Sequence, residues 1–290
     1  MILDTHQHFW KANRGDYHWM TPAVPILARD YLPRDLRPQL RKAGVARTVL
    51  VQAAQTADET DFLLRLAEET DFVAGVIGWF DLEQENFPLV YEEKRKKHPM
   101  LLGVRPMLQD LADDRWILRK QVIENLRYLA ERKVVFEFLT YTRHLPLVLE
   151  VLEEEPRLHA VIDHISKPEI KAGKIEPWND LISKIARHQN VFCKLSGMVT
   201  EADHRVWEPE HLRPYIEHVL DSFGEDRVMF GSDWPVCLLA GSYAEVINAL
   251  RTVAADRLSP SGLAKLFSGN GTRFYGLTEP THADGPPVRR

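Results

Sequence analysis

Cysteines and long apolar runs are scarce in this chain, and each shortage argues against a class of protein. The 290 residues include only two cysteines, Cys193 and Cys237, so no framework of disulfide bonds holds the fold, and we expect a reducing compartment. No apolar run approaches the roughly 20 residues that cross a bilayer, and the first residues lack the pattern of a secretion signal. We therefore expect a cytoplasmic protein with no membrane partner.

Basic clusters are also missing, which argues against nucleic acid as a partner. The formal net charge is −5, and the one run of cations, Lys94 to Lys97, directly follows Glu92 and Glu93. A mixed run of this kind is typical of a solvated helix face. A small-molecule substrate is the partner we expect, and a homo-oligomer stays open.

Short apolar segments recur along the chain, with helical segments between them. Each is apolar throughout instead of alternating, as in parallel strands that are buried on both faces. Strands that alternate with helices indicate βαβ units, and eight such units predict a single-domain α/β protein, a (β/α)8 TIM barrel over residues 1–277. The predicted strands begin near residues 2, 46, 72, 101, 134, 159, 191 and 227. The alternative is a doubly wound open sheet, although no glycine-rich phosphate-binding turn follows the first strand.

Two segments lack this regular pattern. Residues 11–38, rich in Pro, Arg, Asp and aromatic residues, form a long loop after the first strand, and loops of that length in compact domains are usually functional. We expect Tyr17, Trp19 and Tyr31 in this loop to close a pocket from above. The tail, residues 278–290 (TEPTHADGPPVRR), has no apolar periodicity and is predicted to be disordered.

Histidines and an aspartate follow the predicted strands at the end where a barrel places its active site. The first strand ends in His6 and His8, which leave the same side of the strand roughly 7 Å apart. His164 follows the sixth strand and Asp233 the eighth. Three histidines and one aspartate suit a divalent ion such as zinc, with room for water or substrate. Alone, His164 could be a hydrogen-bonded core histidine, and Asp233 could cap a turn.

Cationic and polar residues follow other strands at the same end. Arg105 lies on the fourth strand, His144 after the fifth and Lys194 on the seventh. Each has an ordinary explanation as well: Arg105 could pair with a carboxylate, and the head of Lys194 could extend into water.

Three motifs resemble those of the amidohydrolase superfamily: DTHQHFW, VIDHISKP and MFGSDWPV. With ARDYLP, GVRPMLQD and KLSGMVTEAD, the chain resembles the sugar-lactone hydrolase branch from residue 2 to about residue 275. The resemblance implies that His6 and His8 are the metal-ligand pair of strand one, that His164 is the histidine of strand six, and that Asp233 activates the attacking water.

Two departures from the binuclear members of the superfamily matter. Arg105 occupies the strand-four position of their bridging carboxylated lysine, and strand five offers Glu137 and Thr140 in place of a histidine. The resemblance therefore implies one divalent ion, zinc, or none, but not two.

The expected reaction is hydrolysis of a sugar-acid lactone to the aldonate, a step of carbohydrate metabolism, with L-fucono-, L-galactono-, D-arabinono- or L-rhamnono-lactone as substrate. Asp233 would act as general base towards water, and a cation held by His6, His8 and His164 would polarise the carbonyl. Without metal, His164 with Arg105 or Lys194 would have to supply the positive charge.

Aromatic faces and hydrogen-bonding groups near the strand ends would bind such a polyhydroxylated substrate. The residues expected to do so are Trp10, Gln52, Trp79, Arg105, His144, Lys194 and Trp234. Two other functions stay open: a metal-dependent decarboxylase of the same superfamily, and a non-catalytic barrel that binds a ligand or partner.

Overall fold

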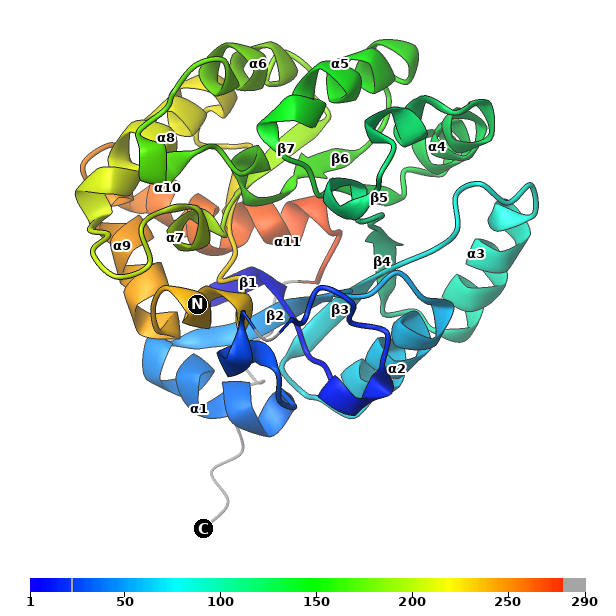
Figure 1. Cartoon of the computed structure of the whole chain (residues 1–290), viewed down its shortest axis with the longest axis horizontal. Helices are drawn as coiled ribbons and strands as arrows, with labels where there is room; N and C mark the ends of the chain where they lie inside the picture. The colour runs from blue at the N-terminus through cyan, green and yellow to red at the C-terminus, as the bar shows by residue number, and fades with distance from the viewer. Residues whose placement is uncertain (22, 279–290) are drawn as a thin grey trace.

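The computed structural model describes residues 1–21 and 23–278. Eight parallel strands pair in sequence order and are surrounded by helices (Figure 1). The strands are β1 (Ile2–Gln7), β2 (Val45–Val51), β3 (Val73–Gly78), β4 (Leu101–Val104), β5 (Val135–Phe138), β6 (Ala160–Ile162), β7 (Val191–Leu195) and β8 (Val228–Phe230). The predicted (β/α)8 barrel is confirmed, with a strand at each predicted position. Apart from Thr278, the tail predicted to be disordered lies outside the described residues.

Most of the helices form the outer layer of the barrel, but Phe274 of the last helix packs with the apolar residues inside the barrel. The helices are α1 (Pro33–Ala43), α2 (Ala57–Glu68), α3 (Phe87–Lys97), α4 (Lys120–Arg132), α5 (Leu145–Glu154), α6 (Trp178–Ile185), α7 (Met198–Glu201), α8 (Pro209–Phe223), α9 (Tyr243–Ala255), α10 (Pro260–Ala264) and α11 (Asn270–Phe274). Within the described residues, none of these helices is both long and apolar enough to span a bilayer. Cys193 and Cys237 are buried free thiols.

Most strand residues are apolar because both faces of the strands are buried. One face packs beneath the helices, as at Leu50, Phe136 and Ile162. The other face fills the inside of the barrel, as at Val135 and Val161. Side chains of successive strand residues point to opposite faces. Because both faces are buried, apolar residues stand at consecutive strand positions and not only at every second one.

The residues just after β8 close the barrel against β1. The amide of Asp233 donates to the carbonyl of His6 (2.8 Å), and the amide of His8 donates to the carbonyl of Trp234 (2.7 Å). The Thr5 hydroxyl donates to the carbonyl of Phe230 (2.6 Å). The seam that closes the barrel therefore brings Asp233 next to the two histidines of β1, although 225 residues separate His8 from Asp233.

The long loop after β1 folds back onto the connection between β2 and α2. The Trp10 indole nitrogen donates to the carbonyls of Leu27 (3.2 Å) and Arg29 (2.9 Å) within the loop. The Trp19 indole nitrogen donates to the carbonyl of Ala53 (2.7 Å) at the end of β2. Aromatic residues of this loop therefore hold it in place as a packed layer.

A buried carboxyl group of α2 supports the same connection. Glu59 accepts hydrogen bonds from the amides of Ala54 (2.5 Å) and Ala53 (3.0 Å). Burial raises the pKa of Glu59 from 4.5 to about 8, even though these two hydrogen bonds lower it. The folded protein therefore keeps this proton at pH values where the unfolded chain has lost it.

This raised pKa predicts a pH-dependent stability. Because the unfolded chain binds fewer protons at Glu59, the free energy of unfolding should fall as pH rises from about 4.5 to about 8, by up to about 1.4 kcal/mol per pH unit. In Glu59→Gln this contribution is gone. Denaturant titrations of both proteins across the window should show the wild type losing stability relative to the variant. A difference in unfolding free energy between the two proteins that does not change with pH would contradict the raised pKa of Glu59.

Candidate active site

On three strands, the side chains that face the barrel interior change from apolar to charged towards the carboxyl end of the strand. The apolar residues that face the barrel interior on these strands are Val135, Val161 and Phe192. Two residues further along each strand, the same face carries Glu137, Asp163 and Lys194, all fully buried. The period of two that organises a strand thus places a layer of charges inside the barrel.

These charges pair within the barrel. The Lys194 ammonium donates to Glu137 Oε2 (2.6 Å) and lies 3.0 Å from Asp163 Oδ1. Arg105 Nη1 donates to Asp163 Oδ2 (3.0 Å), and the Tyr275 hydroxyl donates to Glu137 Oε1 (2.6 Å). Two cations thus face two carboxylates, and this pairing offsets part of the desolvation penalty of the buried charges.

The two carboxyl groups of this network differ in their pKa values. Burial raises the pKa of Glu137 to about 7, although the Lys194 charge opposes the shift. Burial also disfavours ionisation of Asp163, but Lys194 and His6 outweigh it and hold its pKa well below the ordinary value. Asp163 is therefore the anion at the centre of the network.

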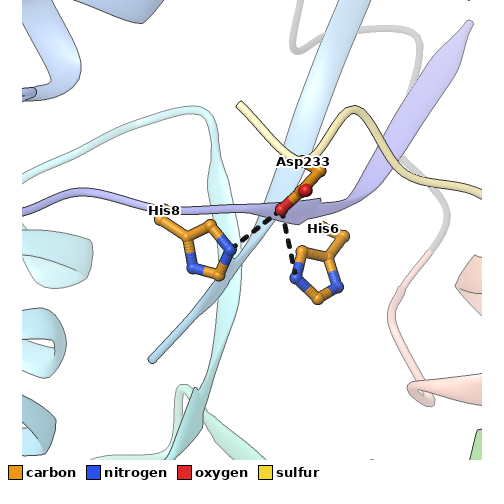
Figure 2. A group of neighbouring side chains, drawn as sticks. All are labelled: His6, His8 and Asp233. Carbon is orange, nitrogen blue, oxygen red and sulfur yellow. Dashed lines mark hydrogen bonds and ion pairs between the residues drawn. The ribbon is translucent and has the colours of Figure 1, made fainter. Parts of the chain in front are cut away.

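Three histidine nitrogens surround one carboxylate oxygen. Asp233 Oδ1 lies 3.3 Å from Nε2 of His8 and 3.9 Å from Nε2 of His6 (Figure 2). Nε2 of His164 also lies 3.9 Å from the same oxygen. All four side chains are at most 4% exposed. The four residues predicted as the metal and catalytic set thus meet at one point.

The other nitrogen of each histidine faces a polar group, which for His8 fixes the tautomer. Nδ1 of His8 lies 2.8 Å from the carbonyl of Val51, which can only accept a hydrogen bond. Nδ1 of His164 lies 2.9 Å from the Ser196 hydroxyl. Nδ1 of His6 lies 3.2 Å from the Lys194 ammonium and 3.5 Å from Asp163 Oδ1. His8 therefore carries its hydrogen on Nδ1 and directs the lone pair of Nε2 towards Asp233.

The protonation states suit a metal ion. Burial lowers the pKa values of His6 and His164 well below the ordinary value, so both rings are neutral. Burial works against ionisation of Asp233, but the nearby His164 and His8 outweigh it and hold its pKa below the ordinary value. Neutral imidazoles and a carboxylate are the form in which these residues bind zinc.

The spacing of the donor atoms also suits one zinc ion. Ligand atoms about 2.0–2.1 Å from a tetrahedral zinc lie roughly 3.3 Å apart. The separation between His8 and Asp233 equals this value, and those from His6 and His164 are somewhat longer. A second candidate group, His6 with Asp163 and His164, shares a histidine with the first. Arg105 Nη1 lies only 3.2 Å from Nε2 of His6, and its charge disfavours a second cation here.

Two of the four residues have a strained backbone. His164 (φ 52°) and Asp233 (φ 57°) lie in the left-handed region, as do Ile165, Ser166 and Lys167. Such conformations cost of order 1–3 kcal/mol each and concentrate at functional sites. The turn after β6 therefore holds His164 at the expense of stability, which favours a functional role over a structural one.

Two glycines leave the space that the histidines occupy. A Cβ at Gly197 would lie 2.6 Å from Nδ1 of His164, and a Cβ at Gly231 would lie 2.6 Å from Cβ of His6. Gly197 also has φ 61°. The glycines of the LSG and FGSD motifs are thus explained by the close approach of the two rings.

Gly197→Ala should therefore disturb the site more than its backbone strain alone would. The matched control is Gly173→Ala, because Gly173 has φ 63° but no atom within 4 Å of its Cβ position. Both variants should lose about 1–2 kcal/mol of stability. Only Gly197→Ala displaces His164, and displacement of about 1 Å can cost about 100-fold in turnover. Equal turnover of the two variants would show that His164 tolerates displacement.

The structure divides the remaining predicted residues into two groups. Arg105, Lys194 and Gln52 lie within the site; Gln52 Nε2 donates to the Arg105 carbonyl (2.8 Å), and Arg105 donates to the Gln52 carbonyl in return. The others are engaged by other neighbours. Trp10 is held by its loop, and Trp234 is buried against Tyr31. The substrate contacts of Trp10 and Trp234 stay predictions, as do those of His144 and Trp79.

The contacts of His144 and Trp79 are with residues outside the cluster of three histidines and Asp233. Nε2 of His144 is 2.8 Å from Asp114 Oδ1, and its Nδ1 accepts from the Tyr141 amide (2.9 Å). Trp79 is half-buried and lines a depression with Thr60 and Phe80.

The sequence analysis gave neither Asp163 nor Glu137 a role. Both are fully buried beside the predicted site. The signal was present in the sequence: each stands two residues after an apolar strand residue, and Asp163 directly precedes His164.

Comparisons with known proteins agree with this geometry. A family model described as Amidohydrolase matches residues 3–277. The chain is 40% identical over 284 residues to an L-fucono-1,5-lactonase of Burkholderia ambifaria, covering 96% of this chain and 97% of that protein. It is 36% identical over 291 residues to an L-fucono-1,5-lactonase of Burkholderia multivorans, covering 97% and 98%.

Solved structures of related proteins have the same fold. The fold superposes with a TM-score of 0.90 on a crystal structure of an amidohydrolase from Burkholderia multivorans with bound HEPES, at 35% identity, covering 96% of this chain and 100% of that chain. A second crystal form from the same organism holds bound zinc and gives a TM-score of 0.89 with the same identity and coverage.

Proposed function

The chain belongs to the amidohydrolase family, and we propose that it is a lactonase that hydrolyses L-fucono-1,5-lactone or a closely related sugar-acid lactone to the aldonate. The observation that carries the proposal is the convergence of His6, His8, His164 and Asp233 at one end of the barrel. The choice of substrate class is supported by similarity, over nearly the full chain, to two proteins named L-fucono-1,5-lactonase.

Asp233 has the properties that the general base of this reaction needs. It is buried, its pKa lies below the ordinary value, and only its Oδ1 is turned towards the histidine nitrogens. Oδ2 can therefore take a proton from a water molecule as the water oxygen bonds to the lactone carbonyl carbon. The same carboxyl group then returns the proton to the ring oxygen as the C–O bond of the lactone breaks.

The residues around Asp233 hold a cation that assists this step. We propose that His6, His8 and Asp233, with His164 beside them, bind one zinc ion, which when bound polarises the carbonyl and stabilises the oxyanion. Nδ1 of His6 lies 3.2 Å from the Lys194 ammonium and 3.5 Å from Asp163 Oδ1. Arg105, 3.2 Å from Nε2 of His6, places a further positive charge at the edge of the site.

Decarboxylation is less well supported. A dihydroxybenzoic acid decarboxylase and a 5-carboxyvanillate decarboxylase share the fold with TM-scores of 0.65 and 0.62, but both are only 14% identical to this chain. Likeness at that level concerns the barrel alone.

The proposal is tested with a panel of sugar lactones. Acid released from L-fucono-, L-galactono-, D-arabinono- and L-rhamnono-lactone is titrated at constant pH, with the spontaneous rate subtracted. We expect the highest kcat/KM for L-fucono-1,5-lactone. A folded protein that opens none of these lactones, or that releases carbon dioxide from aromatic acids instead, would refute the proposal.

Zinc retention gives an independent check on the ligand set. Wild-type protein dialysed against zinc should hold about one ion per chain, because the ligand atoms of His6, His8 and Asp233 all lie within 4.8 Å of one another. His6→Ala removes one donor and should lose most of the metal in elemental analysis. The matched control is His218→Ala, since His218 lies in the outer layer, where its ring packs against Trp178 and its Nε2 contacts the Asn179 carbonyl and two serines. A His6→Ala protein as fully loaded as this control would exclude His6 as a ligand.

A further inference from the structure

Asp4 is a fully buried aspartate of β1 to which the proposed reaction gives no part. It stands two residues before His6 in the DTHQH motif. Over residues 1–21 and 23–278, Asp4 belongs to neither group of side chains whose ligand atoms could share a metal ion. Both of its carboxyl oxygens accept hydrogen bonds from the protein. Asp4 therefore acts on the site through the groups that it holds.

One oxygen of Asp4 holds the backbone on both sides of the seam that closes the barrel. Asp4 Oδ1 accepts from the amide of His6 (3.1 Å) and from the amide of Ser232 (2.8 Å). His6 is a proposed zinc ligand, and Ser232 directly precedes Asp233, which is another. A single oxygen thus joins two segments that carry ligands, although 228 residues separate Asp4 from Ser232.

The turn that carries Asp233 depends on bonds of this kind. Asp233 has φ 57°, and a residue other than glycine keeps such a conformation only where surrounding contacts hold it. The Asp233 amide donates to the His6 carbonyl (2.8 Å). The Ser232 hydroxyl donates to the same carbonyl (3.3 Å) and accepts from the Trp234 amide (3.0 Å). Three consecutive amides are therefore held by Asp4, by His6 and by Ser232.

Tyr243 fixes the orientation of the Asp4 carboxyl group. Tyr243 begins α9 and is buried, and its hydroxyl donates to Asp4 Oδ2 (2.9 Å). Because Oδ2 is held in this way, the carboxyl group is kept from turning about its bond to Cβ, and Oδ1 stays directed at the two amides. A helix of the outer layer thus contributes to the geometry of the site.

We propose that Asp4, oriented by Tyr243, is a positioning residue that sets the separation of His6 and Asp233 and thereby the affinity of the site for zinc. The inference rests on the proposed lactonase site and extends it to a residue outside the ligand set. Removal of a group that orients metal ligands typically weakens metal binding about 10- to 100-fold.

Zinc dissociation constants test the inference, measured without substrate by competition with a chromophoric chelator. Asp4→Ala removes the acceptor of both amides and should weaken zinc binding about tenfold or more. Asp4→Asn should bind zinc as the wild type does, because its amide oxygen still accepts from both backbone amides and its NH2 group can donate to the Tyr243 hydroxyl. Tyr243→Phe frees the carboxyl group to turn and should weaken zinc binding, although less than Asp4→Ala does.

The matched control is Asn270→Ala. Asn270 is also fully buried, and its amide donates to the carbonyls of Glu225 (2.8 Å) and Val228 (2.7 Å), where β8 begins. Both alanine variants break two hydrogen bonds to the backbone, so both should lose stability in denaturant titrations. Only Asp4→Ala should also lose zinc affinity, because Asn270 holds the end of β8 that lies away from the site.

Three results would overturn the inference. The first is a zinc dissociation constant of Asp4→Ala equal to that of Asn270→Ala. The second is a loss of affinity that Asp4→Asn shares with Asp4→Ala, since the conservative variant keeps the bonds. The third applies if Asp4→Ala does not fold: Tyr243→Phe then takes its place, and wild-type affinity of that variant for zinc would contradict the proposal.

Turnover at saturating zinc separates this inference from the proposed function. Asp4→Ala should lower kcat for L-fucono-1,5-lactone and leave KM unchanged, because both oxygens of Asp4 are engaged within the protein. A raised KM with an unchanged kcat would overturn the positioning role. A wild type that opens lactones while Asp4→Ala keeps its zinc affinity would refute the inference and leave the lactonase function intact. Zinc affinity that depends on Asp4 in a protein that opens no lactone would support the inference and refute the function.

Discussion

Asp233→Asn is expected to lower kcat for lactone hydrolysis about 10²- to 10⁴-fold, the usual contribution of a positioned general base. The amide keeps the shape of the carboxyl group but cannot take a proton from water. Asparagine also tolerates the left-handed backbone that Asp233 adopts (φ 57°) nearly as well as aspartate does. The fold should therefore persist, as thermal unfolding would show, and the loss of rate can be attributed to the loss of the Asp233 carboxylate as base and metal ligand.

The matched control for this variant is Asp221→Asn. Asp221 is exposed on α8, where it pairs with Arg257, so its kcat should equal that of the wild type. If Asp233→Asn keeps more than about a tenth of the wild-type kcat while remaining folded, Asp233 is not the general base.

Lys194→Met is expected to destabilise the protein by about 3–5 kcal/mol, the usual cost of removing one partner from a buried ion pair. Lys194 is fully buried, and its ammonium contacts the carboxyl groups of both Glu137 and Asp163. Without it, Arg105 alone faces two carboxyl groups inside the barrel. The free energy of unfolding, from denaturant titration at constant pH, measures the loss.

Two further variants show whether the loss arises from burial of unpaired charge. Lys184→Met breaks an exposed pair with Asp180 on α6, and such pairs contribute at most about 1 kcal/mol. The double variant Glu137→Gln with Lys194→Met removes one orphaned carboxyl group and should recover part of the stability. A Lys194→Met protein as stable as Lys184→Met would show that the barrel charges are not coupled as their distances indicate.

The strands and the central site could be predicted because their signals are local. Each strand is a short apolar run, and His6, His8, His164 and Asp233 stand directly at strand ends, where any parallel barrel gathers its polar groups. The charged layer is almost as local, since Asp163 continues the inner face of β6 by one period.

The surroundings of the residues predicted to contact the substrate could not be predicted in this way, because their neighbours are distant in sequence. The His144 ring reaches Asp114, 30 residues earlier. The Trp10 indole reaches Leu27 and Arg29 through a loop whose path no periodic pattern specifies. An aromatic residue beside a strand end can therefore face the pocket or secure a loop, and only the folded path of the loop decides between the two.

The attack of water on the lactone carbonyl is tested most directly by a single turnover in ¹⁸O-labelled water. With enzyme in excess over L-fucono-1,5-lactone, the product is quenched and the position of the label is read by mass spectrometry. If Asp233 acts as general base, one ¹⁸O appears in the carboxylate of the aldonate in the first turnover. An unlabelled carboxylate would show that Asp233 itself attacks the carbonyl, and a label in the ring-derived hydroxyl would show that a different bond breaks.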